Sequence, residues 1–299
     1  MNLDTNVRLT VFTPTYNREE LLKRLYGSLK RQTVKDFVWL VVDDCSTDGT
    51  KSLIEGYIKE QNEQKDGFCI EYILREKNGG KMRAHNDGVK ATKTPYFLCL
   101  DSDDYLVDTA VEDLLECAEN AGLTEDGENG IAGIISHKGK SETELLSDVK
   151  FPENTDKSTL YGLYLKGFKG ETTIMFVTNV IAKYPFPEIE GEKYVPEDYI
   201  YDKIDKSYEY IVFDKIITVC EIVSEGYTDS VVKLKNNNPT AFYLLYEQRA
   251  VITPLSVLKI KYAGFYVKYA KKCKKPIFKT ELPKIYVCIG LLASVLINE

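Results

Sequence analysis

The chain has 299 residues, of which 43% are hydrophobic and 28% charged, so it can bury the core of one large domain or of a domain with a smaller appendage. Its net charge of -7 and pI near 5.2 argue against a nucleic-acid partner, which requires a basic face to meet phosphates. The charge is uneven: nine Lys against two Glu give residues 250–299 a net charge of +7, which leaves -14 on residues 1–249.

The seven Cys show no Cys-x-x-Cys spacing and lie mostly within apolar runs, which favours reduced, buried thiols and argues against a zinc site. No charged-then-apolar signal segment opens the sequence. The longest apolar stretch, residues 285–297, has 13 residues, fewer than the roughly 18 that a membrane-spanning helix requires. We therefore expect a cytoplasmic protein.

The first third of the chain alternates short apolar runs with helical periodicity. Strands are predicted at residues 7–12, 37–42, 69–74 and 96–100, and helices at residues 18–31, 50–60 and 81–91. Strands joined by helical crossovers build a parallel sheet, and ligands bind beyond the carboxyl ends of its strands. The segments at these ends, residues 13–18, 43–46 and 101–104, should therefore cluster in space.

The pattern changes after residue 121. A polar break at residues 122–130 precedes a predicted strand at residues 131–136 and a charged surface segment that runs to about residue 157. From residue 160 the sequence is irregular and rich in aromatic side chains. An Asn-Asn-Asn-Pro turn at residues 236–239 then introduces the final helical segments.

The predicted strand at residues 96–100 stops at three carboxylates, Asp101, Asp103 and Asp104. In an extended chain alternate side chains share a face, so Asp101 and Asp103 can point together while Asp104 points away. Charges beside a core cost several kcal/mol unless a cation or hydrogen bonds compensate them, so a divalent metal suits this pair better than turn or helix-cap chemistry.

No glycine-rich phosphate loop occurs in the sequence, neither the dinucleotide fingerprint nor the P-loop pattern. A carboxylate and a phosphate about 4 Å apart repel by roughly 4 kcal/mol at an effective dielectric near 20, and an interposed cation converts that repulsion into attraction. The acids are therefore intelligible as a metal site for a diphosphate.

Four motifs in fixed order make the function more specific. They are Thr-Pro-Thr-Tyr-Asn-Arg at residues 13–18, Val-Val-Asp-Asp-Cys-Ser at 41–46, Asn-Gly-Gly-Lys at 78–81 and Leu-Asp-Ser-Asp-Asp at 100–104. Together they resemble family 2 glycosyltransferases over about residues 7–120. The resemblance implies the α/β GT-A fold, a Rossmann-like mixed sheet flanked by helices, and an inverting sugar transfer with Mn²⁺ or Mg²⁺ as the cofactor.

The resemblance also implies residue roles. Tyr16 should lie against the nucleotide base, and Asp44 should accept the imide N–H of uracil or thymine, a donor that cytosine lacks. Asp101 should contact the ribose, and Asp103 should bind the metal, with Asp101 and Asp104 as further metal candidates. The implied nucleotide-sugar site comprises Pro14, Thr15, Tyr16, Arg18, Asp44, Lys81, Asp101 and Ser102. Met82 stands where the family often has His, so Lys81 and Arg83 are the residues that could supply positive charge instead, and Lys81 is the expected phosphate contact.

Residues 186–198 more faintly resemble the acceptor-side segment of bacterial polysaccharide-assembly members, in which an acidic pair supplies the base. An inverting transfer requires a carboxylate that deprotonates the acceptor hydroxyl as it attacks the anomeric carbon. We predict Asp198 as this base and Glu197 as the second candidate. The alternative is a solvated helix start after Pro196.

We expect a catalytic domain at residues 1–235, with a nucleotide-sugar half at about 1–120 and an acceptor half at about 121–235, followed by a basic helical extension at 236–299. The expected activity is transfer of a hexose or N-acetylhexosamine from a UDP-sugar to a glycan or lipid-linked saccharide of a bacterial surface polysaccharide. The basic, aromatic tail either contacts an anionic membrane peripherally or packs on the catalytic domain.

Two alternatives are kept. A sugar-phosphate nucleotidyltransferase would also use an acidic metal site, but it would need a glycine-rich basic loop at residues 13–18. A catalytically silent nucleotide- or glycan-binding module would fit the same sheet.

Overall fold

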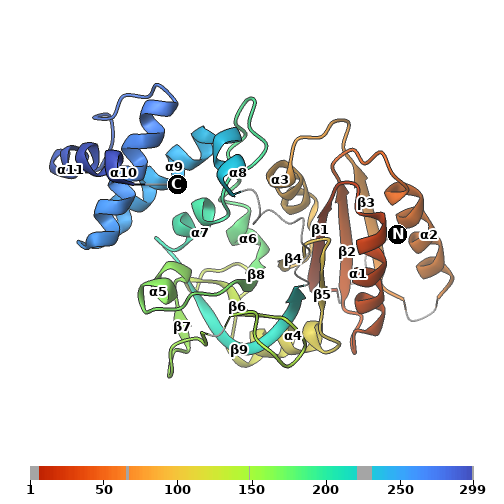
Figure 1. The fold of residues 1–299 in the computed structure, drawn as a ribbon. Helices are drawn as coiled ribbons and strands as arrows, with labels where there is room; N and C mark the ends of the chain where they lie inside the picture. The colour runs from red at the N-terminus through yellow and green to blue at the C-terminus, as the bar shows by residue number, and fades with distance from the viewer. Residues whose placement is uncertain (1–6, 65–66, 148, 221–230, 298–299) are drawn as a thin grey trace. The chain divides into compact units, whose positions relative to one another are not determined.

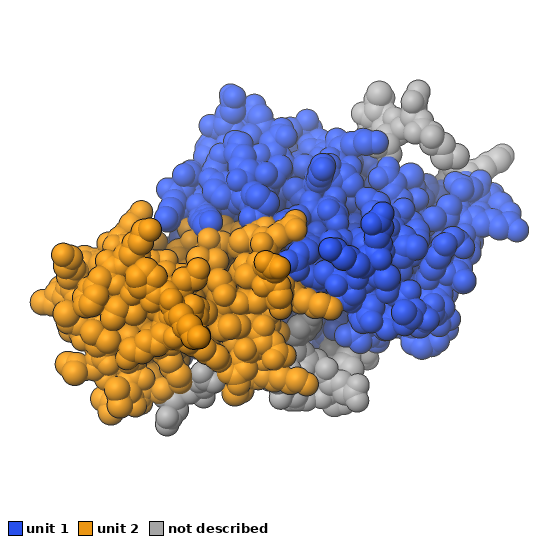
Figure 2. Space-filling model, turned by 90° about the horizontal axis from the view of Figure 1, so that it is seen from above, with its two compact units in different colours: residues 1–185, 203–223 blue, residues 186–202, 224–299 orange. Residues whose placement is uncertain are grey.

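The structure is a computed structural model that describes residues 7–64, 67–147, 149–220 and 231–297. The chain divides into two compact units, coloured separately in Figure 2. Unit 1 comprises residues 1–185 and 203–223, and unit 2 comprises residues 186–202 and 224–299. The predicted division into residues 1–235 and 236–299 remains a proposal, to which the structure adds that residues 186–202 group with the C-terminal helices.

Unit 1 begins with the predicted βα units (Figure 1). The strands are β1 (Leu9–Thr15), β2 (Phe37–Asp43), β3 (Cys69–Leu74) and β4 (Tyr96–Cys99), and the helices are α1 (Glu19–Arg31), α2 (Thr50–Glu63) and α3 (Lys81–Ala91). β2 and β4 flank β1 in parallel, and β3 pairs in parallel with β2. The strands and helices predicted for residues 7–100 are confirmed, with ends that shift by three residues or fewer.

Burial explains why these segments could be recognised. Every residue of β1 and β2 is buried, as expected for strands covered on both faces, and their apolar runs are therefore nearly continuous. α1 buries Leu22, Leu25 and Leu29 along one stripe. α3 packs closely on β1 because Gly88 leaves room for the ring of Phe12, which a β-carbon at this position would meet at 2.3 Å.

The rest of the sheet is mixed. It contains β5 (Asp104–Leu106), β6 (Ile131–Gly139), β7 (Lys157–Ser158), β8 (Thr172–Val177) and β9 (Glu209–Cys220), in the order β3-β2-β1-β4-β8-β6-β9-β5, with β7 paired to β9. β8 runs antiparallel to both β4 and β6, whereas β6 and β9 are parallel. The helices of this part are α4 (Ala110–Asn120), α5 (Leu160–Leu165) and α6 (Thr178–Ile181). The predicted α/β fold with a mixed sheet is confirmed.

Unit 2 is helical. It contains α8 (Val231–Asn237), α9 (Pro239–Ile252), α10 (Val257–Lys272) and α11 (Lys284–Leu296), and the first residues of α7 (Asp198–Ile204) also belong to it. Its core is aromatic, with Phe242, Tyr246, Tyr266 and Tyr269 at its centre. The side-chain oxygen of Asn238 accepts hydrogen bonds from two backbone N–H groups of residues 193–194 at 3.0 Å, which holds segment 186–202 to the start of α9. Among the described helices, none combines the length and apolar composition of a membrane span.

Candidate functional site

The loops that follow β1 and β2 are tied together, as predicted for neighbouring strand ends. The Asp44 N–H donates to the Thr15 carbonyl at 2.8 Å. Asn17 adopts a positive φ of 52°, its N–H donates to Ser46 Oγ at 2.9 Å, and its side-chain oxygen accepts from the Thr47 N–H at 2.8 Å. These bonds fix both loops on one edge of the sheet.

The four predicted ligand contacts of the first loop divide into two pairs. Pro14 and Thr15 are buried residues of β1, not loop residues, because the strand extends three residues beyond its predicted end. Tyr16 and Arg18 lie beyond the strand and are exposed, Tyr16 by 44%. An exposed tyrosine ring at this edge can stack on a flat ligand, whereas Pro14 and Thr15 can act only through the backbone and the buried Thr15 hydroxyl.

The two aspartates that follow β2 have different surroundings. Asp43 is fully buried; one of its carboxylate oxygens accepts from the Ser46 N–H and the other from the Tyr72 hydroxyl, both at 2.7 Å. These bonds use both oxygens to fix the loop, so Asp43 is structural.

Asp44 holds the Asn-Gly-Gly turn. Its carboxylate accepts the N–H groups of Gly79 at 2.9 Å and Gly80 at 2.6 Å and forms an ion pair with Arg75, which also pairs with Asp87 at 2.7 Å. A carboxylate offers about four lone-pair sites, so one remains for a further donor. Recognition of a base by Asp44 stays a prediction, while its link to the turn, and the role of Arg75, were missed by the sequence analysis.

The turn leads into α3, whose first residue contacts the acidic motif. Lys81 Nζ lies 2.7 Å from Asp101 Oδ1 and 2.9 Å from Oδ2. Burial alone would raise the pKa of Asp101, but the ammonium groups of Lys81 and Lys138 hold that pKa below its ordinary value. The third and fourth motifs therefore meet, and Asp101 stays ionised.

The acids do not follow an extended chain, and the predicted alternation of their side chains is wrong. β4 ends at Cys99, the Asp104 N–H donates to the Asp101 carbonyl at 3.0 Å, and β5 begins at Asp104. The chain turns here because β5 pairs antiparallel with β9, Asp104 opposite Cys220, instead of continuing beside β1. Residues 101–104 thus form a hydrogen-bonded turn, with Ser102 buried inside it.

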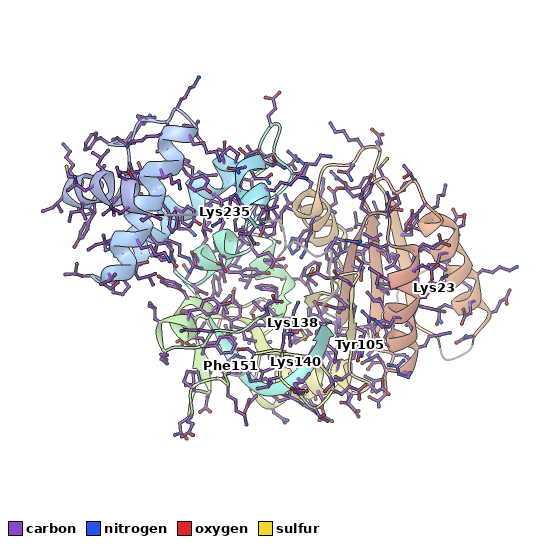
Figure 3. The ribbon with its side chains drawn as sticks, viewed as in Figure 1. Lys23, Tyr105, Lys138, Lys140, Phe151 and Lys235 are labelled. Atoms are coloured by element: carbon purple, nitrogen blue, oxygen red, sulfur yellow. The ribbon has the colours of Figure 1, made fainter. Side chains whose placement is uncertain are left out.

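Each of the three carboxylates has its own environment. Asp101 pairs with Lys81. Asp104 pairs at 3.0 Å with Lys138 of β6, which is labelled in Figure 3, and the side chains of Asp104 and Lys138 are both largely buried. Asp103 is half-buried, and no hydrogen bond or ion pair joins its carboxylate to another described residue. Asp103 is the carboxylate most open to a cation. The sequence analysis did not identify Lys138, which lies 34 residues from its partner.

The Lys138 pair shows strong electrostatic coupling. Burial raises the pKa of Asp104, and Asp101 adds to this, while Lys138 opposes it. Burial would lower the pKa of Lys138, but Asp104 and Asp101 raise that pKa well above its ordinary value. Lys138 is therefore a fixed cation beneath the turn, and Asp104 is the least suited of the three acids to bind a metal.

The turn fits a hard divalent cation. No group of three or more His, Cys, Asp or Glu within the described part of the chain is placed to hold a metal. Mg²⁺ and similar ions usually take one or two carboxylates and complete their coordination with water and substrate phosphates. Asp103, with Asp101 beside it in the turn, meets that requirement.

The residue predicted to act as the catalytic general base, Asp198, lies in unit 2 at the start of α7. Asp198 Oδ2 is 3.3 Å from a guanidinium nitrogen of Arg249, and the Asp198 side chain is 43% exposed. One turn along the helix, Asp202 is buried and forms an ion pair with the same guanidinium. Desolvation, together with Glu197, raises the pKa of Asp198 against the opposing charge of Arg249, and desolvation raises the pKa of Asp202 to about 6.

The comparison with protein families now identifies this fold and its motifs. Residues 10–131 match the model of glycosyl transferase family 2. This match confirms the predicted resemblance to the family for the part of the chain that carries the motifs, and the prediction of a glycosyltransferase is confirmed. The match covers β1 to the start of β6, which carries all four motifs.

Relatives of known activity cover different shares of the chain. A GalNAc(5)-diNAcBac-PP-undecaprenol beta-1,3-glucosyltransferase of Campylobacter jejuni is 27% identical over 97% of this chain and 90% of its own length. A teichoic acid poly(glycerol phosphate) polymerase of Staphylococcus epidermidis is 34% identical, but this chain spans only 15% of it. The poly(ribitol-phosphate) beta-N-acetylglucosaminyltransferase TarP of Staphylococcus aureus is 32% identical, over 54% of this chain and 49% of its own.

Solved structures confirm the GT-A fold. S. aureus TarS 1-349 has a TM-score of 0.59 at 19% identity, covering 89% of this chain and 72% of its own. The mannosyltransferase PcManGT from Pyrobaculum calidifontis, in complex with GDP-Man and Mn2+, has a TM-score of 0.57 at 15% identity, covering 97% of this chain and 81% of its own. At these identities the likeness concerns the fold alone.

Proposed function

We propose that this glycosyltransferase transfers a hexose or N-acetylhexosamine, with inversion, from a UDP-sugar to a glycan or lipid-linked saccharide in bacterial surface polysaccharide synthesis. The observation that carries the proposal is the linkage of all four motifs at the carboxyl ends of the parallel strands. The Asp44 N–H donates to the Thr15 carbonyl, and the Asp44 carboxylate holds the Asn-Gly-Gly turn. Lys81, which follows that turn, pairs with Asp101 in the turn that also contains Asp103. The C. jejuni relative, named for a glucosyltransferase acting on an undecaprenol diphosphate saccharide, supports the acceptor class. The TarS complex with UDP-GlcNAc supports the donor class.

Charge distribution at the turn supports a metal-assisted departure of the diphosphate. Asp103 would hold Mn²⁺ or Mg²⁺ with Asp101 as the second carboxylate, and the bound ion would offset negative charge on the leaving group. The ammonium of Lys81, which compensates the charge of Asp101 in this structure, lies at the same place and is the expected contact of a donor phosphate. We assign the donor phosphates to the part of the turn that carries Asp103, Asp101 and the ammonium of Lys81.

Asp198 is suited to the role of base. Its raised pKa brings its basicity closer to neutral pH than that of an ordinary aspartate, which favours proton transfer from the acceptor hydroxyl. Arg249 positions the carboxylate from α9 at 3.3 Å, and Glu197 remains the second candidate. The nucleotidyltransferase and silent-module alternatives gain no support, because loop 13–18 has no glycine and the acids of the turn are intact.

A donor screen tests the proposal. UDP-, dTDP- and GDP-sugars are incubated with Mn²⁺, and released nucleotide is measured with and without EDTA. We expect metal-dependent release from a UDP-sugar that Asp103→Asn abolishes, while Asp108→Asn, which removes a carboxylate paired with Arg31 on the surface, leaves it unchanged. If no nucleotide sugar is cleaved in the presence of metal, the proposal fails.

We further propose a cytoplasmic enzyme whose C-terminal helices contact an anionic membrane. Among the described residues, eight of the fourteen exposed large apolar side chains lie between residues 255 and 296, including Leu292 (76%) and Leu296 (83%) on α11. Exposed lysines accompany them, which is the composition of an interfacial helix on acidic lipid.

Vesicle sedimentation tests this contact. Vesicles with phosphatidylglycerol should bind the protein, and vesicles of phosphatidylcholine alone should bind it weakly. Replacing Leu292 and Leu296 by Ser should reduce the binding, whereas Leu74→Ser, at an apolar side chain of β3 that is 45% exposed, should not. Equal binding by all variants would exclude the membrane contact.

A further inference from the structure

Three polar side chains on α1 and at its C-terminal end contact the backbone of residues 103–107. Arg24, Ser28 and Gln32 follow one another at intervals of four residues, so they lie along one face of the helix. The Arg24 guanidinium donates to the Asp103 carbonyl. Ser28 Oγ accepts a backbone N–H at 3.2 Å, and Gln32 Nε2 donates to a backbone carbonyl at 2.8 Å. This face of α1 therefore holds the chain as it leaves the acidic turn.

The peptide group between Asp103 and Asp104 is held from both sides. Its N–H, which belongs to Asp104, donates to the Asp101 carbonyl at 3.0 Å and closes the turn. Its carbonyl, which belongs to Asp103, takes no part in the closing bond of a four-residue turn, and the Arg24 guanidinium donates to it. The two bonds together fix the orientation of this peptide plane, and so the direction in which the Asp103 side chain leaves the turn.

The guanidinium of Arg24 is itself held in place. Its central carbon lies 5.2 Å from the centroid of the Tyr105 ring, within the range of cation–π attraction (Figure 3 labels Tyr105). A guanidinium donates in fixed directions, and a charged donor makes a stronger hydrogen bond than a neutral one. Arg24 is also half-buried, so it has the environment of a fixed support for the turn.

We propose that Arg24 is a positioning residue for the metal, because by holding the Asp103 carbonyl it directs the Asp103 carboxylate at the cation. The inference rests on the proposed function, in which Asp103 binds Mn²⁺ or Mg²⁺. Groups that hydrogen-bond to a metal-binding residue typically change metal affinity by about 10–100-fold. Arg24 lies outside the four motifs, and its partner is 79 residues away in the sequence.

The sign of the effect distinguishes positioning from simple electrostatics. Arg24 is a cation that contacts the residue proposed to bind the metal, so by Coulomb repulsion alone its removal would strengthen the binding of Mn²⁺. A residue that only stabilised the fold would leave the metal affinity of the folded protein unchanged. Removal of a positioning residue weakens metal binding, which neither of the other roles predicts.

Calorimetric titration of the full-length protein with UDP, with and without Mn²⁺, tests the inference. The factor by which Mn²⁺ tightens UDP binding measures the coupling between metal and nucleotide. Arg24→Met keeps an unbranched side chain but removes the donor, so it should reduce this factor by about tenfold or to unity, while UDP affinity without metal stays within about twofold. Lys23→Met is the matched control, since Lys23 is the neighbouring residue on α1, is 47% exposed and pairs with Glu20; both affinities should stay within about twofold of wild type (Figure 3 labels Lys23).

A second variant keeps the inference testable if Arg24→Met does not fold. Arg24→Lys retains the positive charge but lacks the planar fork of the guanidinium, so it should reduce the coupling by about threefold or more. Circular dichroism and urea unfolding check that the variants are folded. Coupling equal to or greater than that of wild type, in folded Arg24→Met or otherwise in Arg24→Lys, overturns the inference.

The failure of the proposed function gives a different result. If Mn²⁺ does not tighten the binding of UDP to wild type, or if Asp103→Asn keeps the coupling, the proposed metal role of Asp103 fails and the role of Arg24 fails with it. If the coupling is present in wild type, lost in Asp103→Asn and retained in Arg24→Met, only the role of Arg24 fails.

Discussion

Replacing Lys138 by Met should destabilise unit 1 far more than a surface lysine replacement would. The Asp104 side chain is 7% exposed and faces Asp101 as well as Lys138, so it would keep a buried charge with its cation gone. Removal of one partner of a buried pair costs about 3–5 kcal/mol. Asp104 can instead become neutral by taking up a proton, but at pH 7 this costs about 4 kcal/mol for a carboxyl group with an ordinary pKa of 3.8. The protonated form limits the loss of unfolding free energy at pH 7 to about 4 kcal/mol, within the range of about 3–5 kcal/mol expected for a broken buried pair.

The pH dependence follows with a definite sign. Without Lys138, Asp104 is protonated in the folded state at pH values where it is ionised in the unfolded chain. The folded state then binds more protons, so stability falls as pH rises above 3.8. The loss of unfolding free energy in Lys138→Met, relative to wild type, should shrink to about 2 kcal/mol at pH 5, because protonating Asp104 costs less free energy at that pH.

Urea unfolding followed by fluorescence measures this effect. Trp39, the only tryptophan, is fully buried in β2 of unit 1 and reports on the unit that contains the pair. Lys140→Met is the matched control, since Lys140 lies on the same segment but is 40% exposed and pairs with exposed Glu144, so it should change stability by about 0–0.5 kcal/mol (Figure 3). Adding Asp104→Asn to Lys138→Met should recover part of the loss. Equal deficits in Lys138→Met and Lys140→Met, or a deficit that does not depend on pH, would refute the reasoning.

Other predictions concern the site itself. Asp44→Asn should destabilise the Asn-Gly-Gly turn and weaken UDP binding by tenfold or more in calorimetry, because an amide cannot accept all the N–H donors that the carboxylate accepts; unchanged binding would remove Asp44 from the site. Asp198→Asn should abolish transfer and leave UDP affinity within about twofold, and retained transfer would remove it from the mechanism. The rate of transfer should fall as pH drops through the raised pKa of Asp198, and Arg249→Gln should move this limb to higher pH by removing the opposing charge; a limb that does not move would contradict the positioning role. EDTA should abolish donor cleavage without lowering the urea midpoint, and a lowered midpoint would mean that the metal is structural.

The sequence predicted those parts of the molecule whose signals are local. The strands of residues 7–100 follow from short apolar runs that are nearly continuous, the helices follow from a period of 3.6 residues, and the position of the acids at 101–104 follows from a strand that ends in carboxylates. Lys138, Arg75 and Arg249 were missed because each pairs with an acid at least 31 residues away, and no local pattern marks such partners. The side-chain directions of residues 101–104 were predicted wrongly because the rule for extended chains does not hold within a hydrogen-bonded turn.

The partners of the three acids explain how such a turn can end a buried strand. Lys81 neutralises Asp101 and Lys138 neutralises Asp104, so two of the three negative charges are compensated within the protein. The remaining charge belongs to half-buried Asp103, where water can reduce its cost. The fold therefore does not need a cation to tolerate the acids, and the uncompensated carboxylate is left for one. If Asp103 binds the proposed metal, this division makes stability and metal affinity separable: replacing Lys138 should change the first, and replacing Asp103 should change the second.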